Sequence, residues 1–218
     1  MILEALVVGM FQSNCYLVGS EATGEAMVVD PGDEGSRILK TLERRHLSAK
    51  LIVVTHTHID HVAALEEVRE ATGASVAMHR EAFDSVQRDA PLLRMMLGTQ
   101  PRPLSPPDLF LEDGDKLKVG DLEFEVLFCP GHAYGHVCLY GQGVVLTGDA
   151  LFAGGIGRFD LPGGDGRLLL RSIREKLLTL PDETVVLPGH GPSSTIGEEK
   201  ATNPFLLYPR MYMGIDPG

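Results

Sequence analysis

Residues 51–61 read LIVVTHTHIDH and decide the fold of this 218-residue chain. The first four are a continuous apolar run, which predicts a strand buried on both faces. The turn that follows carries four metal-competent side chains, namely His56, His58, Asp60 and His61. From His61 onward the apolar residues follow a helical spacing. We therefore expect the cluster on a strand-to-helix turn at the carboxyl end of a strand, where open α/β sheets usually place their sites.

The chemistry of this cluster points to a metal centre. A lone histidine is more often a hydrogen-bonded loop residue than a ligand. Four such side chains packed behind one rigid strand favour metal binding instead. Imidazole and carboxylate ligands suit zinc, iron or manganese.

Length and composition indicate one domain over residues 1–218. The first residues carry no basic side chain before their apolar stretch, and no run is long enough to span a bilayer, so we expect neither a secretory signal nor a membrane partner. Cys15, Cys129 and Cys138 are widely spaced, which argues against a disulfide framework and favours a cytoplasmic location. The net charge of -11 would repel a phosphate backbone, so no nucleic acid partner is expected.

Apolar periodicity and turn residues predict the order of elements. Strands are expected at residues 2–8, 14–18, 25–29, 51–54, 75–78, 116–119, 122–128, 136–140, 144–146 and 184–187. Helices are expected at residues 36–47, 61–71, 80–97 and 167–178, with Gly73 capping the second. The proline-rich residues 98–107 can form neither a regular helix nor a central strand.

The last third of the chain repeats the plan of the first. Residues 28–30 lead through a glycine-rich break, a helix and a buried strand to His56. Residues 145–149 lead through a glycine-rich loop, a helix and a buried strand to His190. This repetition suggests two β-rich halves related by a pseudo-twofold axis, although two βαβ units can also be alike by chance.

Three further metal-competent residues stand in turns directly after apolar strands: His132, Asp149 and His190. Side chains in such turns can meet although they come from different strands. With the four residues of the first cluster they supply five imidazoles and two carboxylates. That set is sufficient for two metal ions.

These motifs resemble those of the metallo-β-lactamase superfamily. THTHIDH, PGHAYGH, TGDALF and PGHG match its motifs in order and spacing over nearly the whole chain. The resemblance implies an α/β fold of the four-layer αββα sandwich type. It also implies two divalent ions, with zinc expected and iron or manganese possible. In that family the ions are held by two groups of ligands and a bridging carboxylate, which correspond here to His56, His58 and His132; to Asp60, His61 and His190; and to Asp149.

The loop GDALFAGGIGRFDLPGGD, residues 148–165, narrows the resemblance to the glyoxalase II group of hydroxyacylglutathione hydrolases and their short bacterial relatives. These enzymes hydrolyse thioesters. Arg158 occupies the position of a basic residue that contacts glutathione in that group. Two tyrosines of the group are replaced, one by Asp160 and one by Gly191-Pro192. No separate C-terminal glutathione-binding domain is expected.

The resemblance thus predicts a metal-dependent hydrolase acting on a small-molecule thioester. A hydroxide bridging the two ions would attack the acyl carbonyl, since a metal can lower the pKa of its water from about 15.7 to about 7. A thiol of pKa about 8.5 leaves as thiolate without a strong general acid. Asp60 is the predicted catalytic residue, binding metal and orienting the hydroxide, and Arg158 is the predicted substrate-binding residue.

Three alternatives stay open. A mononuclear iron sulfur dioxygenase that oxidises persulfides shares this scaffold and carries an Arg and an Asp in the same loop. Lactone or phosphodiester hydrolysis, and a non-catalytic metal-binding module, are the others.

We interpret His136 as structural. Residues 91–107, with Met95 and Met96, are predicted either to cover the core or to line the substrate cleft. The oligomeric state is open.

Overall fold

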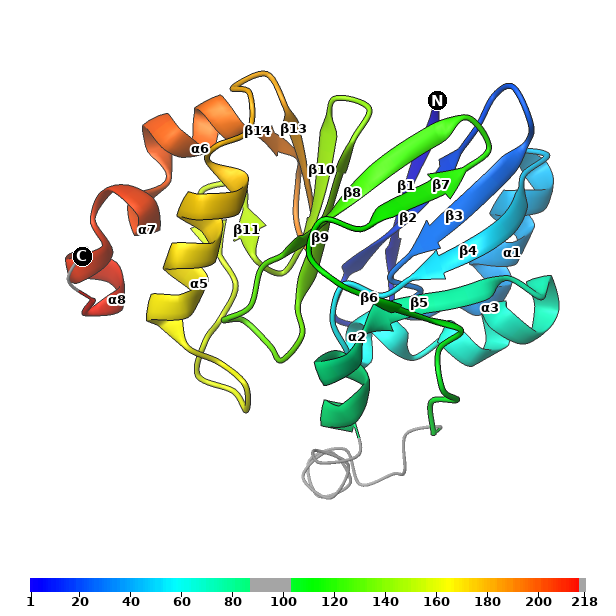
Figure 1. The fold of residues 1–218 in the computed structure, drawn as a ribbon, viewed down its shortest axis with the longest axis horizontal. Coiled ribbons are helices and arrows are strands. Elements are labelled where there is room, and N and C mark those ends of the chain that lie inside the picture. The colour runs from blue at the N-terminus through cyan, green and yellow to red at the C-terminus, as the bar shows by residue number, and fades with distance from the viewer. Residues whose placement is uncertain (87–102, 216–218) are drawn as a thin grey trace.

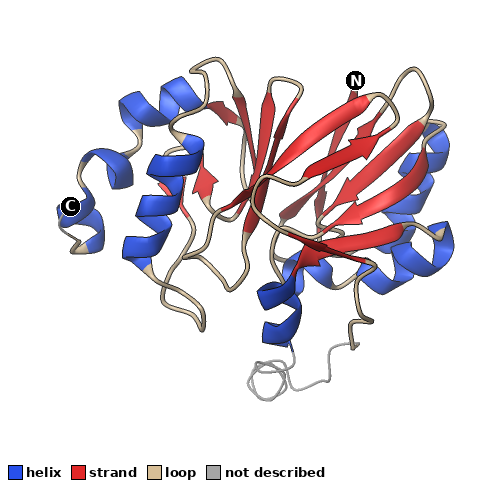
Figure 2. Cartoon of the chain, in the orientation of Figure 1, coloured by secondary structure: helices blue, strands red, loops and turns tan. Residues whose placement is uncertain are grey.

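The computed structural model describes residues 1–86 and 103–215. Within them, two six-stranded sheets face each other, and helices cover the outer face of each sheet (Figures 1 and 2). The four layers are helix, sheet, sheet and helix, so the predicted αββα sandwich is confirmed.

The first sheet is formed by the N-terminal half of the chain and follows sequence order. Its strands are β1 (Ile2–Val8), β2 (Ser13–Gly19), β3 (Glu25–Val29), β4 (Ser48–Val53), β5 (Ser75–His79) and β6 (Leu109–Leu111). The first three strands form an antiparallel meander, and the remaining neighbours pair in parallel. The helices on its outer face are α1 (Gly35–Arg44) and α3 (Leu65–Thr72).

The second sheet has the order β14-β13-β10-β9-β8-β7. Its strands are β7 (Lys116–Val119), β8 (Leu122–Phe128), β9 (Val137–Gly141), β10 (Val144–Gly148), β13 (Val185–Pro188) and β14 (Ser194–Thr195). A small hairpin precedes the outer helices, formed by β11 (Leu151–Phe152) and β12 (Gly155–Ile156). The outer helices are α5 (Gly166–Ser172), α6 (Ile196–Thr202), α7 (Pro204–Leu207) and α8 (Pro209–Met213).

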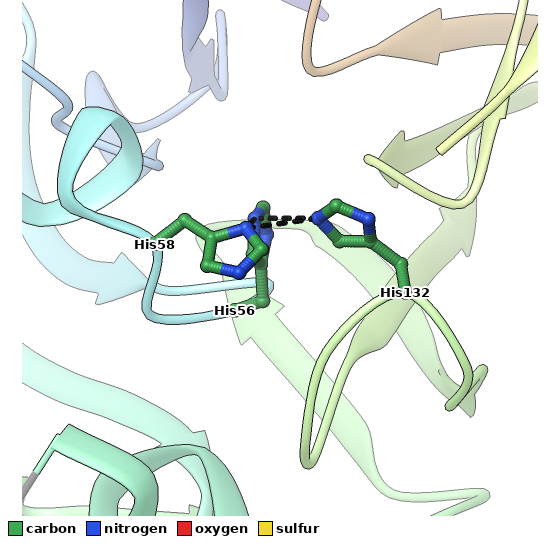
Figure 3. Close-up of side chains that lie close together, drawn as sticks. All are labelled: His56, His58 and His132. Atoms are coloured by element: carbon green, nitrogen blue, oxygen red, sulfur yellow. Dashed lines mark hydrogen bonds between the residues drawn. The ribbon is translucent and has the colours of Figure 1, made fainter. Parts of the chain in front are cut away.

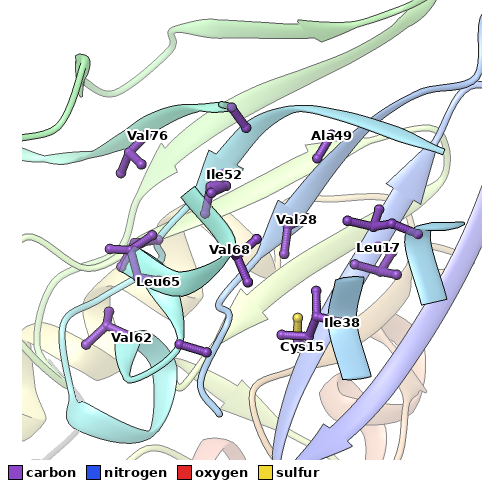
Figure 4. Close-up of a cluster of buried hydrophobic side chains, with 14 of the residues drawn as sticks. Cys15, Leu17, Val28, Ile38, Ala49, Ile52, Val62, Leu65, Val68 and Val76 are labelled. Carbon is purple, nitrogen blue, oxygen red and sulfur yellow. The ribbon is translucent and has the colours of Figure 1, made fainter. Parts of the chain in front are cut away.

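Strand β4 explains why the apolar run is continuous. Ile52 points outward and packs in the core beneath the helices with Ile38 and Leu65 (Figure 4). Val53 points the other way, into the core between the two sheets, where Phe124 is fully buried. A third core lies between the second sheet and its own helices. Burial of the strand on both faces is therefore confirmed, because each layer boundary needs its own apolar surface.

Each sheet contains the predicted strand-helix-strand unit. In the first half, β3 pairs in parallel with β4, and α1 connects them. In the second half, β10 pairs in parallel with β13, and α5 lies on the connection. Both units end at a predicted ligand, because His56 follows β4 and His190 follows β13.

Two predicted helices differ from the structure. The helix expected at residues 61–71 is divided into α2 (Ile59–Val62) and α3, because the Ala64 N–H donates to the Pro31 carbonyl at 3.0 Å instead of continuing the first helix. Gly73 does cap α3 in the left-handed conformation, with φ of 68°. The helix expected at residues 167–178 changes at Ile173 into a π-helical turn ending at Leu177.

The structure also contains elements that were not predicted, namely β6, the hairpin of β11 and β12, β14 and the helices that follow β14. Of the helix expected at residues 80–97, residues 80–86 are helical and the rest lies outside the described residues. Residues 103–107 have no regular structure, as their prolines predict. None of the helices within residues 1–86 and 103–215 has the length and apolarity needed to cross a membrane.

Candidate metal centre

Three imidazoles form the first group of the centre. His56 and His58 lie on the turn between β4 and α2, and His132 lies in the loop after β8 (Figure 3). His56 Nε2 is 3.1 Å from His58 Nδ1, and His132 Nε2 is 3.3 Å and 3.0 Å from these two atoms. Three ring nitrogens from both halves of the fold therefore point at one another (Figure 3).

Two imidazoles and a carboxylate form the second group. Asp60 and His61 belong to α2, and His190 follows β13. Asp60 Oδ2 is 3.1 Å from His190 Nε2 and 3.6 Å from His61 Nε2. His61 is fully buried, whereas the other two are partly exposed.

Asp149, directly after β10, lies between the two groups. Its Oδ1 is 3.4 Å from His61 Nε2, and its Oδ2 is 3.6 Å from both His132 Nε2 and His190 Nε2. One carboxylate thus reaches ligand atoms of both groups. The structure brings all seven sequence-predicted residues together, and their role as metal ligands stays a prediction.

The donor set fits divalent cations. His61 Nε2 and Asp149 Oδ1 are buried and have no hydrogen-bond partner among the described residues. Buried polar atoms are almost always paired, so an ion between these two would satisfy both. Five imidazoles and two carboxylates are ligands for zinc, iron or manganese.

Asp30 supports the centre from behind, a role that sequence reasoning missed. Its carboxylate accepts hydrogen bonds from the Thr55 N–H at 2.7 Å and the Thr55 hydroxyl at 2.6 Å, and lies 3.1 Å from His61 Nδ1. Thr55 Oγ1 is in turn 3.1 Å from His56 Nδ1. These contacts hold the inner nitrogens, so that the Nε2 atoms of both histidines face the centre.

The available signal for Asp30 was its place in an Asp-Pro-Gly break after a buried strand. Its φ of 52° and its contact with His61 could not be read from that pattern. A non-glycine residue in the left-handed region is uncommon, and here the hydrogen bonds from Thr55 hold the Asp30 side chain in place.

Two other contacts orient ligands from the second half. His132 Nδ1 is 2.7 Å from the carbonyl oxygen of Arg158, which leaves its Nε2 for the centre. His136 is fully buried, and its Nε2 accepts a hydrogen bond from the Asp149 N–H at 3.1 Å. His136 therefore holds the backbone of Asp149, as its structural interpretation requires.

The histidines of the two groups differ in pKa, because their neighbours differ in charge. Burial, together with the neighbouring His61, lowers the pKa of His58 to about 4, and burial with neighbouring imidazoles lowers the pKa of His132 to about 3. Burial acts in the same direction on His61, but Asp149 and then Asp30 outweigh it and raise the pKa of His61 to about 9. Burial also raises the pKa of Asp149. The first group thus favours neutral imidazoles, whereas the second balances positive against negative charge.

The N-terminal half holds the loop that carries His190. The Asn14 side-chain amide donates to the Pro188 carbonyl at 2.8 Å and to the Gly191 carbonyl at 3.0 Å. The Tyr16 hydroxyl donates to the same Pro188 oxygen at 2.8 Å. Strand β2 therefore fixes a ligand loop of the opposite sheet, which joins the two halves at the centre.

A pocket of about 480 Å³ opens over the two groups. The described residues that line it are Phe11, Thr57, His58, Ile59, Asp60, Ser85, Val86, His132, Ala133, Tyr134, Asp149, Phe152, Arg158, Leu161, Pro162 and His190. Arg158 lines the pocket, where its guanidinium pairs with the Asp160 carboxylate, and its role in substrate binding stays a prediction. The predicted role of Met95 and Met96 as a cleft wall concerns residues outside the described ranges.

This fold and this cluster of candidate ligands place the protein in the class of metallo-hydrolases. The family model described as the metallo-beta-lactamase superfamily matches residues 8–190. The chain belongs to the metallo-beta-lactamase superfamily.

Two curated relatives are similar over nearly their whole length. The probable metallo-hydrolase YqgX of Bacillus subtilis is 40% identical over 205 residues, covering 91% of this chain and 94% of the relative. Hydroxyacylglutathione hydrolase GloC of Haemophilus influenzae is 37% identical over 209 residues, covering 94% of this chain and 98% of the relative.

Three solved structures have the same fold. The B3 metallo-beta-lactamase BLEG-1 has a TM-score of 0.85 at 34% identity, over 94% of this chain and 99% of that one. TTHA1623 in a di-iron-bound form has a TM-score of 0.83 at 38% identity, covering 93% of this chain and 100% of that chain. ETHE1 from Myxococcus xanthus has a TM-score of 0.82 at 30% identity, covering 100% of this chain and 92% of that chain.

Proposed function

We propose that this protein hydrolyses small-molecule thioesters at a centre of two divalent metal ions. The observation that carries the proposal is the position of Asp149, which lies within 3.6 Å of ligand atoms from both groups. A carboxylate shared between the two ligand groups suits a pair of adjacent cations, because its charge reduces their mutual repulsion. We expect zinc, with iron or manganese as the alternatives.

The chain's own residues prepare the site for that chemistry. When bound, the two ions would lower the pKa of a shared water and polarise an acyl carbonyl in the pocket. Asp60 lines the pocket and is partly exposed, so its carboxylate can accept a hydrogen bond from that water as well as bind metal. Asp30 and the Arg158 carbonyl hold the imidazoles that face the centre.

The rest of the pocket supports a thioester over an amide. Apart from the seven candidate ligands, the titratable side chains among its described lining residues are Tyr134 and Arg158. The ion pair with Asp160 raises the pKa of the Arg158 guanidinium further above its usual range, so this side chain is a poor proton donor at neutral pH. An amine leaving group needs a proton, whereas a thiolate leaves without one. The likeness to GloC, which is named as a hydroxyacylglutathione hydrolase, also supports a thioester.

One alternative is favoured by a specific observation. Two histidines and one carboxylate are the ligands of non-haem iron oxygenases, and His132 Nε2 lies 3.3 Å from His56 Nε2 and 3.6 Å from Asp149 Oδ2. A single iron at these three residues would suit a persulfide dioxygenase. The completeness of the second group, Asp60 with His61 and His190, favours the two-metal hydrolase.

The test combines elemental analysis with a substrate panel on metal-loaded protein. The panel contains lactoyl thioesters of glutathione and of N-acetylcysteamine, a lactone, a phosphodiester and glutathione persulfide. We expect two ions per chain and thiol release from a thioester without oxygen consumption. One iron per chain with oxygen consumed from the persulfide would replace the proposal by the dioxygenase. If only the lactone or only the phosphodiester were turned over, that compound class would replace thioesters as the proposed substrate.

A further inference from the structure

The pocket over the metal centre is mainly apolar outside the candidate ligands. Seven of its described lining residues have apolar side chains: Phe11, Ile59, Val86, Ala133, Phe152, Leu161 and Pro162. Phe152 lies against the ring of His190, with 6.2 Å between the ring centroids. Such walls favour the burial of uncharged groups and penalise a carboxylate that finds no partner.

A carboxylate entering this pocket would need a cation, and Arg158 is the one lysine or arginine among the described lining residues. Its guanidinium already holds a carboxylate. Arg158 Nε donates to Asp160 Oδ1 at 2.8 Å, and Arg158 Nη2 donates to Asp160 Oδ2 at 2.9 Å. This two-pronged contact occupies the Nε/Nη2 edge of the guanidinium, one of the edges with which arginine recognises a carboxylate.

Asp160 competes for that guanidinium from within the same loop. The two hydrogen bonds from Arg158 lower the pKa of Asp160 to about 2, so the carboxylate is charged at every pH at which the protein is expected to work. Because Asp160 follows two positions after Arg158, its effective concentration at the guanidinium is millimolar or higher. A substrate carboxylate at lower concentration displaces it poorly.

We propose that the pocket selects thioesters whose thiol part carries no carboxylate, and that Asp160 imposes this selection by occupying Arg158. The inference rests on the proposed thioesterase function and narrows its substrate class. A neutral thiol part fits the apolar walls, whereas glutathione brings two carboxylates to a pocket in which Arg158, the one lysine or arginine among the described lining residues, is already paired. Asp160 is a specificity-determining residue here and has no part in the hydrolytic step.

The first measurement compares two substrates with the same lactoyl group. One is the glutathione thioester, and the other is the uncharged N-acetylcysteamine thioester. The monoethyl ester of the glutathione substrate, with its glycyl carboxylate masked, is the intermediate case. We expect KM to be at least about fivefold higher for the glutathione thioester than for the uncharged one, with the monoethyl ester between them and with similar kcat, because uniform binding is what differs.

The second measurement uses Asp160→Asn. This change frees the guanidinium, so KM for the glutathione thioester should fall about fivefold or more, with KM for the N-acetylcysteamine thioester unchanged. Adding Arg158→Gln to Asp160→Asn should abolish the gain. The matched control is Asp182→Asn, which removes the same charge from an exposed ion pair with Lys200 that is not part of the pocket. It should leave the preference unaltered.

A binding measurement separates this inference from the hydrolytic function. S-hexylglutathione has a thioether that cannot be hydrolysed, and calorimetry should show tighter binding to Asp160→Asn than to the unmodified protein. Equal binding by both proteins, with equal KM values for the charged and uncharged thioesters, would overturn the inference while leaving thioester hydrolysis intact. Failure to hydrolyse any thioester would overturn the proposed function and, with it, this assignment of substrate class.

Discussion

Asp149 Oδ1 lies 3.4 Å from His61 Nε2, and both atoms are buried without a hydrogen-bond partner among the described residues. A buried polar atom that stays unpaired costs folding free energy. The two atoms come from opposite halves of the sandwich, one after β10 and one in α2. A metal ion contacting both would therefore stabilise the interface between the halves as well as complete the centre.

Asp149→Ala should lose much of its metal and nearly all of its activity, because the carboxylate that neutralises two adjacent cations is gone. We expect kcat/KM to fall by more than about 100-fold, the upper range for loss of a mere supporting contact to a ligand. Elemental analysis after dialysis and thioester kinetics check this. Full occupancy of both sites in the variant would contradict the bridging assignment. Circular dichroism serves as the control for folding.

Asp60→Asn should keep the fold and slow hydrolysis by about 100-fold or more, the range for loss of an acid–base group. The amide cannot supply the ligand charge or accept a proton from water. Steady-state kinetics on protein of measured metal content checks this prediction. If turnover per bound metal pair stayed unchanged, Asp60 would have no part in the mechanism.

Asp30→Asn should weaken metal binding by about 10- to 100-fold, since outer partners of metal ligands typically contribute that much. The substitution removes the charge that faces His61 Nδ1 and alters the contacts to Thr55. Competition with a chromogenic chelator measures the affinity. Asp33→Asn removes the same charge from an exposed residue of the same loop and should have little effect. If both variants lost metal affinity equally, the effect would come from the change in net charge and not from the contact with His61.

Metal uptake by the metal-free protein should release protons at pH 7. The pKa of His61, raised to about 9, keeps a proton on this ring that a metal must displace. Because the protonated fraction falls as pH rises toward 9, apparent metal affinity should increase between pH 7 and 9 and then level off. A pH indicator in weakly buffered solution counts the protons released. No release on saturation at pH 7 would show that His61 is already neutral or does not bind the metal.

Gly189→Ala should disrupt the centre although no ligand is removed. A Cβ at residue 189 would lie 2.1 Å from Asp149 Oδ1 and 2.8 Å from His61 Cε1, so one of these side chains must move. A displacement of about 1 Å can reduce the rate by about 100-fold. Kinetics and metal content check this prediction. The matched control is Gly155→Ala, where the nearest atom lies 3.8 Å away and a methyl group fits. Similar losses in both variants would argue against steric crowding of the centre.

The sequence alone was sufficient for the features that depend on near neighbours. The apolar run of β4 and its turn, with His56 and His58, were readable because strand burial and turn formation follow from local patterns. The division between α2 and α3 was not readable, because a hydrogen bond from Ala64 to Pro31 causes it. A hydrogen-bond partner that comes from another loop leaves no trace in the apolar periodicity of the sequence.

The centre itself combines both kinds of information. The motifs predicted which residue types would gather, but the packing of two sheets decided that Asp149 lies between His61 and His132. Tertiary structure alone placed Asp30 behind His61. The sequence predicted Arg158 as a substrate-binding residue, and the conformation of its loop placed the guanidinium against Asp160. The contacts of Asp149 and Asp30 depend on the relative positions of backbone segments far apart in the chain, which are set by burial of the three cores rather than by any local pattern.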